Sequence, residues 1–251
     1  MKKRHVIYPI LLLITIFIAI GLFNERIRKP EKTAFARGYQ VALDNGCFNC
    51  HGPSGIQGIP NPNSKPEEVP AWQGGTAMMY IFGPNDIEHW VLDGGLPSQK
   101  PDTTALIQMP AYREVLSAKE FQDLKVYLEA VMEIITIDDP LAERGYNIAE
   151  NAGCFGCHGP YGLGGNKNPG AFKKYIPGWE GEDYAELVHN KEELRKWIED
   201  GYLERIENNA IANFLTEDQV IKMPGYKDVL STDEIASIEH YIEWLRKQNL
   251  H

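Results

Sequence analysis

Two short stretches of the 251-residue chain place two cysteines and a histidine at the spacing Cys-x-x-Cys-His. Thiols at this spacing can bond covalently to the two vinyl groups of one porphyrin, and the adjacent imidazole then ligates the iron. The motifs therefore predict two covalently attached haem c groups. The residues of the two motifs are Cys47, Cys50, His51, Cys154, Cys157 and His158.

Two other interpretations of a Cys-x-x-Cys pair are a thioredoxin-like redox pair and half of a zinc site. A redox pair has no use for the adjacent histidine, and a zinc site needs further cysteine or histidine ligands nearby. The chain has four cysteines, and all of them lie in these two motifs. The absence of a spare thiol favours haem attachment over both alternatives.

The charge balance restricts the class of partner. Residues 1–30 hold six of the 25 basic and one of the 35 acidic residues, which leaves 19 against 34 and a formal charge of −15 on the remainder. Nucleic-acid binding needs a basic surface, so we expect no nucleic acid. An acidic surface suits a redox protein partner with a basic docking surface, or it serves solubility alone.

The N-terminal segment reads as a membrane anchor. An uncharged apolar run from Val6 to Phe23 follows the basic start of the chain, and eighteen helical residues rise about 27 Å, close to the thickness of a hydrocarbon core. A cleaved signal peptide is the alternative, but Ala19-Ile20-Gly21 is a weak cleavage site inside a continuous run. Because haem is attached outside the cytoplasmic membrane in bacteria, we expect a single-pass protein whose soluble domains face the periplasm.

The rest of the chain is an internal repeat. The haem motifs match at an offset of 107 residues, and the later matches, such as Met109-Pro110 with Met223-Pro224, have an offset of 114. A seven-residue insertion near Tyr202 to Leu215 in the second copy explains the change. We therefore predict an anchor with flanks (1–30), a first domain (31–136), a linker (137–140) and a second domain (141–251). The linker is too short to be a flexible spacer, so the two domains should pack together.

Each copy is expected to be mostly helical, with poor strand signals throughout. Thr33 and the two Ser-x-x-Glu capping boxes at Ser117 and Ser231 mark helix starts. The Gly- and Pro-rich stretches 52–70 and 159–177 read as loops. The expected first and middle helices are Ala34–Leu43, Asp86–Leu92, Leu141–Glu150 and Lys191–Glu199.

The methionines Met109 and Met223 are the candidate distal iron ligands. A thioether is a suitable sixth ligand for low-spin haem iron, and Met223 is the single methionine of residues 141–251. The repeat then selects Met109 in the first copy, and the following proline holds each methionine in a turn. Two alternatives remain: both methionines fill gaps in the core, or histidines take their place. The candidate histidines are His89, His189 and His240.

The order of N-terminal helix, Cys-x-x-Cys-His, loop, middle helix, methionine and C-terminal helix resembles the class I cytochrome c family. The resemblance covers each domain from end to end and implies an all-α fold: an N-terminal transmembrane helix followed by two tandem class I cytochrome c domains. It also implies that Gly38 and Gly145 let the first helix cross closely against the last, at Tyr127 and Tyr241.

The family pattern implies further site residues. The carbonyl of Pro62, and of Pro169 in the second copy, is expected to accept the proximal imidazole N–H, although a plain loop proline is the alternative. Trp72 and Trp179 are expected either to donate an indole N–H to a haem propionate or to pack in the core. Trp90 and Trp197 read as core residues.

Tandem domains behind an anchor resemble the membrane-bound dihaem cytochromes of respiratory chains. The resemblance implies a carrier of single electrons between respiratory partners, or a companion subunit of a membrane oxidoreductase complex, and not an enzyme in its own right. The alternative is a dihaem periplasmic enzyme of the peroxidase or thiosulfate-oxidising type, which needs one haem with an open sixth position. The equivalence of Met109 and Met223 argues against that alternative.

Overall fold

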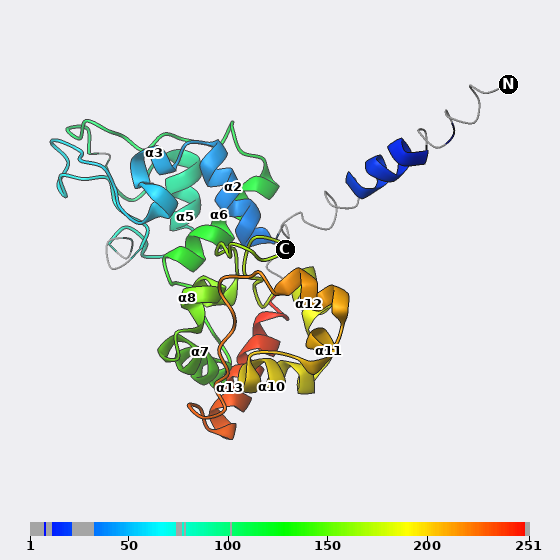
Figure 1. The fold of residues 1–251 in the computed structure, drawn as a ribbon. Coiled ribbons are helices and arrows are strands. Elements are labelled where there is room, and N and C mark those ends of the chain that lie inside the picture. Colours follow the sequence, from blue (N-terminus) through cyan, green and yellow to red (C-terminus); the bar gives the residue numbers. More distant parts are fainter. Residues whose placement is uncertain are drawn as a thin grey trace.

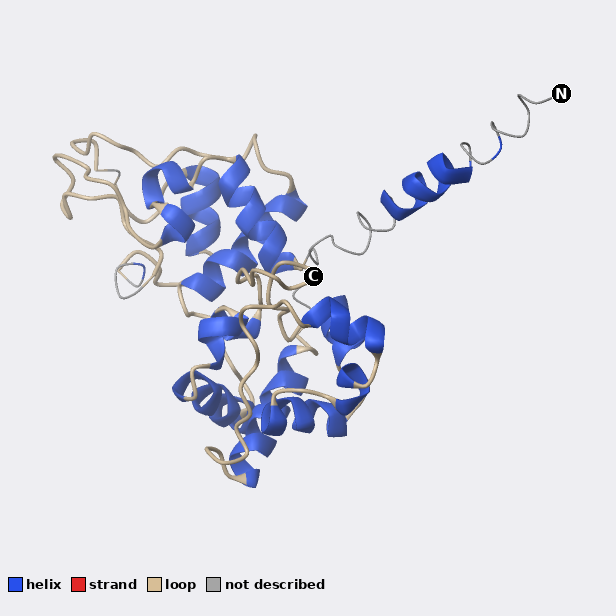
Figure 2. Ribbon diagram, viewed as in Figure 1, coloured by secondary structure: helices blue, strands red, loops and turns tan. Residues whose placement is uncertain are grey.

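The computed structural model describes most of the chain after the N-terminal segment (Figure 1). Within this part the fold is built from helices and loops, and no strand occurs there (Figure 2). Two isolated antiparallel bridges, Pro60 with Glu68 and Lys167 with Tyr175, occupy equivalent places in the two copies. The all-α prediction is confirmed for these residues. The described residues are 8, 12–21, 33–73, 77, 79–100 and 102–248.

The helices that the two copies share follow one another in the same order. In each, the first and last helices pack extensively on each other, α2 on α6 and α7 on α13. The first copy consists of α2 (Ala34–Asp44), α3 (Phe48–His51), the short 3-10 turn η1 (Pro53–Gly55), α5 (Asp86–Glu88), the π-helix η2 (His89–Asp93) and α6 (Ala118–Val131). The second consists of α7 (Pro140–Asn151), α8 (Cys154–His158), the 3-10 turn η3 (Pro160–Gly162), α9 (Glu182–Leu187), α10 (Lys191–Asp200), α11 (Glu204–Glu207), α12 (Ala210–Thr216) and α13 (Thr232–Leu245).

A glycine sits at each crossing of first and last helix. A Cβ atom added to Gly38 would lie 2.0 Å from the carbonyl oxygen of Asp123 and 2.7 Å from Cβ of Tyr127. At Gly145 the corresponding distance to the carbonyl oxygen of Ser237 is also 2.0 Å. The close crossing predicted at these two glycines is confirmed.

Side-chain caps start the helices where the sequence predicts. The hydroxyl of Thr33 accepts a hydrogen bond from the Ala36 amide, at the start of α2. Both capping boxes are formed: Ser117 and Ser231 accept from the glutamate amide three residues on, and that glutamate reaches back to the serine amide. The middle helix of the first copy differs from the prediction, because only Asp86–Glu88 is α-helical and the following turn is the π-helix His89–Asp93.

The cores of the two copies differ at two paired positions. Next to Tyr127 of the first copy lies Phe35 of α2, with ring centroids 5.1 Å apart. The equivalent of Phe35 is Ala142, and the space beside Tyr241 is filled instead by Trp244 of α13, stacked at 6.0 Å. The equivalent of Trp244 in the first copy is Ala130, which is fully buried. A large side chain thus lies on the first helix of one copy and on the last helix of the other.

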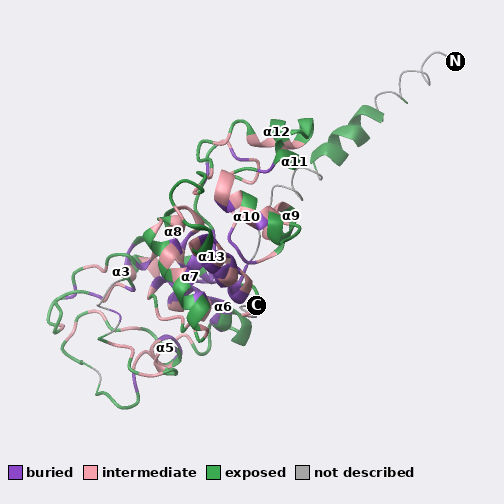
Figure 3. Ribbon diagram, turned by 90° about the horizontal axis from the view of Figure 1, so that it is seen from below, coloured by how far each residue is buried: buried purple, intermediate pink, exposed green. Residues whose placement is uncertain are grey.

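The two copies share one continuous apolar core, in which buried residues gather along α13 and the helices around it (Figure 3). The connection between the copies is held by side chains of the second: the phenol of Tyr161 donates to the Ile135 carbonyl and the indole of Trp244 to Asp138. Asp139 caps α7, so this helix begins at Pro140, within the stretch predicted as linker. The prediction that the two domains pack together is confirmed.

The predicted anchor lies largely outside the described residues. Residues 12–21 are helical and exposed. Among the residues that the structure describes, no helix is long and apolar enough to cross a membrane. The predicted insertion of the second copy forms α11 and α12 (Figure 1).

Candidate haem-attachment sites

Each Cys-x-x-Cys-His motif lies on one short helical turn. Cys47 caps α3, and Cys50 and His51 are on that helix, while α8 carries the corresponding residues of the second motif. Residues three apart on a helix lie on the same face, so the two thiols of each motif point to one side. All four cysteines are free thiols and half-buried.

The environment of two of the four thiols differs from that of a reactive redox cysteine or a zinc ligand. Burial raises the pKa of the Cys47 and Cys154 thiols above the ordinary value. A reactive redox cysteine has its pKa lowered, and a zinc ligand must be a thiolate. Within the described ranges, no group of three or more His, Cys, Asp and Glu side chains could hold a metal ion.

Both proximal histidines are oriented by a backbone carbonyl. Nδ1 of His51 lies 2.8 Å from the Pro70 oxygen, and Nδ1 of His158 lies 2.9 Å from the Pro177 oxygen. A carbonyl only accepts, so Nδ1 carries the proton and Nε2 of a neutral ring keeps its lone pair. Burial lowers the pKa of both histidines against the opposing effect of the carbonyl, which favours the neutral ring. The arrangement fits an iron ligand with a fixed tautomer.

The carbonyls at these positions correct the prediction for Pro62 and Pro169. The loop after each motif folds back through its antiparallel bridge, so a proline nineteen residues after the histidine, and not one eleven residues after it, reaches the ring. The carbonyl of Pro62 accepts from the Leu106 amide, at 3.1 Å, and so holds the loop before Met109. A signal for the true acceptors was present in the sequence, because the pattern Pro-x-Trp of Pro70 and Pro177 recurs at the offset of 107.

Tryptophans cover the two histidines. The rings of Trp72 and His51 have centroids 4.8 Å apart, and those of Trp179 and His158 lie 5.2 Å apart. Both tryptophans are buried, and a Cβ on Gly55 would lie 2.1 Å from the Trp72 ring. This supports packing against the proximal ligand, while donation to a propionate stays a prediction. Trp90, predicted as core, is half-buried and donates its indole N–H to the Tyr80 carbonyl.

A buried asparagine holds each methionine loop. The side-chain amide of Asn61 donates to the Ile107 carbonyl at 3.0 Å, and its oxygen accepts from the Ile107 amide at 2.8 Å. Asn168 makes the same two bonds to Ile221, at 2.8 and 2.9 Å. Both asparagines are almost completely buried. The recurrence of the two asparagines at the offset of 107 is visible in the sequence, but their role is not, because it depends on contacts 46 and 53 residues away along the chain.

Glycine and tyrosine complete the placement of the methionines. Met109 and Met223 are half-buried, and a Cβ added to Gly201 would lie 2.3 Å from the Met223 carbonyl oxygen. The phenol of Tyr226, three residues after Met223, donates to the Ala152 carbonyl at 3.3 Å and lies next to the Cys154 thiol. The structure therefore brings each methionine loop to the cysteine motif of its own copy.

The three alternative histidine ligands are paired with carboxylates. Nδ1 of His89 lies 3.0 Å from Asp93, and Nε2 of His240 lies 2.8 Å from Asp139. His189 lies 3.8 Å from Glu193. These contacts support their interpretation as ordinary, partly exposed histidines.

Comparisons with known proteins bear on the second copy. The chain is similar to the ribonucleoside-diphosphate reductase large chain of Schizosaccharomyces pombe, with 34% identity over 89 residues. That match covers 31% of this chain and 11% of the reductase, so the chain spans about a tenth of that relative's length. No solved structure matches the chain. The cytochrome c family matches residues 142–246, and this second copy is therefore a cytochrome c domain, which implies a covalent haem c at Cys154 and Cys157.

Proposed function

We propose that the protein is a membrane-anchored dihaem c-type cytochrome that carries single electrons between respiratory-chain partners, as a shuttle or as a subunit of a membrane oxidoreductase complex. The observation that carries this proposal is the equivalence of the two sites. Each has a Cys-x-x-Cys-His turn, a proline carbonyl on the histidine and an asparagine on the methionine loop. The first copy, outside the range of the family match, is thereby assigned a second haem.

The residues of each site fit such a group. Cys47 and Cys50 would hold the first haem covalently, and His51 and Met109 would bind its iron. Cys154, Cys157, His158 and Met223 would do the same in the second copy. A haem held in this way supplies a reversible one-electron change at its iron. The protein fixes the imidazole by the Pro70 carbonyl and the thioether loop by Asn61, so neither ligand has to move when the charge of the site changes.

Iron bound by both a histidine and a methionine would have no position left for a substrate, which separates a carrier from a dihaem enzyme. The apolar run 6–23 would anchor the chain in the bacterial cytoplasmic membrane, with the domains on the periplasmic side. Anchoring raises the effective concentration of the carrier near membrane-bound partners. The charge of −15 on residues 31–251 supports a partner with a basic docking surface.

Haem content and ligation test the proposal. The intact mass after acid–acetone extraction should exceed the polypeptide mass by two haem groups, and a mass with one haem or none would refute it. Met223→Ala should remove about half of the far-red sulfur-to-iron charge-transfer band and lower the potential of one haem, and Met109→Ala should do the same to the other. If either substitution leaves the band and both potentials unchanged, that methionine is a core residue and the enzyme alternative becomes the better one.

A further inference from the structure

The insertion that distinguishes the second copy presents an uncharged apolar surface. Ile211 and Phe214, three residues apart on one face of α12, are 75% and 69% exposed. No charged residue occurs from Asn208 to Thr216, in a chain whose surface is otherwise rich in carboxylates. Val220, on the segment that returns from α12, is 70% exposed. Exposed apolar side chains gathered in this way mark an interaction site more often than scattered ones do.

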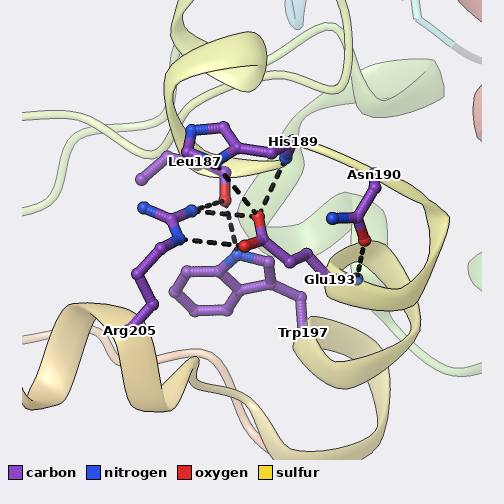
Figure 4. Close-up of polar contacts among 6 residues, drawn as sticks. All are labelled: Leu187, His189, Asn190, Glu193, Trp197 and Arg205. Atoms are coloured by element: carbon purple, nitrogen blue, oxygen red, sulfur yellow. Dashed lines mark hydrogen bonds and ion pairs between the residues drawn. The ribbon is translucent and has the colours of Figure 1, made fainter.

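An ion pair and hydrogen bonds connect α11 of the insertion to the rest of the second domain. Arg205 of α11 makes a bidentate ion pair with Glu193 of α10, at 2.9 and 3.0 Å (Figure 4). The same guanidinium donates to the Leu187 carbonyl, which also accepts the indole N–H of Trp197. Asn209 then caps α12 through two amides. The helix that precedes the apolar face is thus tied to the domain.

The segment after α12 contacts a loop of the second copy that also reaches the start of the first domain. The Val220 amide donates to the Pro169 carbonyl at 2.9 Å, and Gly170 lies against the Asp218 carbonyl. The same loop reaches the first copy at Gly165, where an added Cβ would lie 3.9 Å from the Phe35 ring. Phe35 is the second residue of α2.

We propose that α12 dips into the surface of the membrane that holds the N-terminal anchor. The proposal rests on the anchoring proposed above. Nine residues, 24–32, separate the apolar run from Thr33, which limits this residue to about 30 Å from the end of the run. A tether of this length keeps the apolar face of α12 within reach of lipid, and helices that lie in the membrane interface bury such a face. Glu217 and Asp218 flank α12, so the attraction is apolar and does not need anionic lipid.

Spin labels on the full-length holoprotein in liposomes of neutral phosphatidylcholine test the proposal. A keto-bearing amino acid, introduced at position 211, 214, 229 or 14, carries the label without adding a thiol. Power saturation then compares collisions with oxygen, which partitions into lipid, and with a water-soluble nickel chelate. Labels at 211 and 214 should favour oxygen several-fold over nickel. The matched control is position 229, because Val229 is 73% exposed yet lies outside the insertion, and its label should favour nickel.

The label at position 14 separates the two proposals. If it lies in lipid while those at 211 and 214 collide freely with nickel, the membrane contact of α12 is refuted and anchoring stands. If position 14 also lies in water, anchoring fails and this inference fails with it. Protection at 211 and 214 that disappears when the protein is diluted in lipid would show contact between copies of the chain, and would also refute lipid contact. A further label at position 220 should also lie in lipid, and the double substitution Ile211→Asn and Phe214→Asn should move it to water.

Discussion

Adding a single methyl group at Gly38 tests the packing on which each domain depends. In an unobstructed helix position the change from glycine to alanine stabilises by about 1 kcal/mol, because it reduces the freedom of the unfolded chain. Gly38 is not unobstructed, since the new Cβ would lie 2.0 Å from the Asp123 carbonyl oxygen and 2.7 Å from Cβ of Tyr127. Real Cβ atoms essentially never approach closer than 3.0 Å, so α2 and α6 would have to separate.

The size of the effect follows from that separation. A shortfall of 1.0 Å against the 3.0 Å limit falls on backbone, which cannot swing away as a flexible side chain can. Inserting a methyl into a filled core costs about 1–3 kcal/mol, and here the upper end applies because two whole helices must shift. After the gain of about 1 kcal/mol in helix propensity, we expect Gly38→Ala to lower the free energy of unfolding by about 2 kcal/mol.

Urea unfolding of the full holoprotein, followed by circular dichroism, measures the effect. Gly95→Ala is the matched control in the same copy, since no atom lies within 4 Å of its added Cβ and its backbone does not require glycine. Its free energy of unfolding should change by less than about 0.5 kcal/mol, or rise. A rise of about 1 kcal/mol in Gly38→Ala would show that the helices are not in close contact at this residue, and would refute the crossing argument.

Three further predictions concern the hydrogen bonds of Asn168 and the dependence of stability on alkaline and on acidic pH. Asn168→Ala removes both hydrogen bonds from the Met223 loop, at about 1 kcal/mol each, so the far-red band of one haem should vanish at a lower urea concentration than in the wild type. If the urea midpoint of that band is unchanged, Asn168 does not hold the loop. Burial raises the pKa of Tyr241, so above about pH 10 the unfolded chain loses this proton while the folded chain keeps it, and the free energy of unfolding falls with rising pH. In urea titrations Tyr241→Phe should reduce the slope of that fall by up to about 1.4 kcal/mol per pH unit. An equal slope in wild type and variant would show that Tyr241 is not its source. Burial raises the pKa of Asp123, but the hydrogen bond and charge of Arg37 outweigh burial and hold this pKa below its usual range. The ion pair therefore stabilises the fold above about pH 4, and this stabilisation is lost as the pH falls and the carboxylate protonates. Asp123→Asn should reduce the acid dependence of the unfolding midpoint, and full retention of that dependence would exclude this ion pair as its source.

The sequence predicts features of the site that are local or repeated. The turn carrying Cys47 and His51, the capping boxes and the glycines at the helix crossings are each specified by a few neighbouring residues and recur in both copies. These predictions describe the arrangement within one stretch of chain or one pair of helices. Local chemistry is sufficient to specify them.

The features that were missed depend on how loops fold back. Pro70 rather than Pro62 reaches His51 because a bridge between Pro60 and Glu68 reverses the loop, and no local pattern predicts that isolated bridge. The role of Asn61 depends on Ile107, 46 residues away. The recurrence of both patterns marked the positions as important, but only the folded chain shows which atoms meet.

The large side chain beside the crossing tyrosine comes from the first helix in one copy and from the last helix in the other. This difference affects which helices can pack on each other during folding. Because both crossings use the same glycine and tyrosine, α2 could in principle dock on α13, and α7 on α6. The first error would bring Phe35 and Trp244 together against Tyr241, where the native core has Trp244 and, at the position equivalent to Phe35, the small Ala142. The second would leave Ala142 and Ala130 beside Tyr127, with a void in place of an aromatic ring.

The first error would cost about 1–3 kcal/mol because it overfills the core, and the second about 3–5 kcal/mol because it removes a buried aromatic ring. Tandem domains of similar sequence are prone to such exchange, within one chain or between neighbouring chains. The ion pair of Arg37 with Asp123 adds to the discrimination, because the second copy has Ser237 in place of the aspartate. The two copies thus have different side chains around a helix crossing that uses the same glycine and tyrosine, and each first helix packs best on the last helix of its own copy.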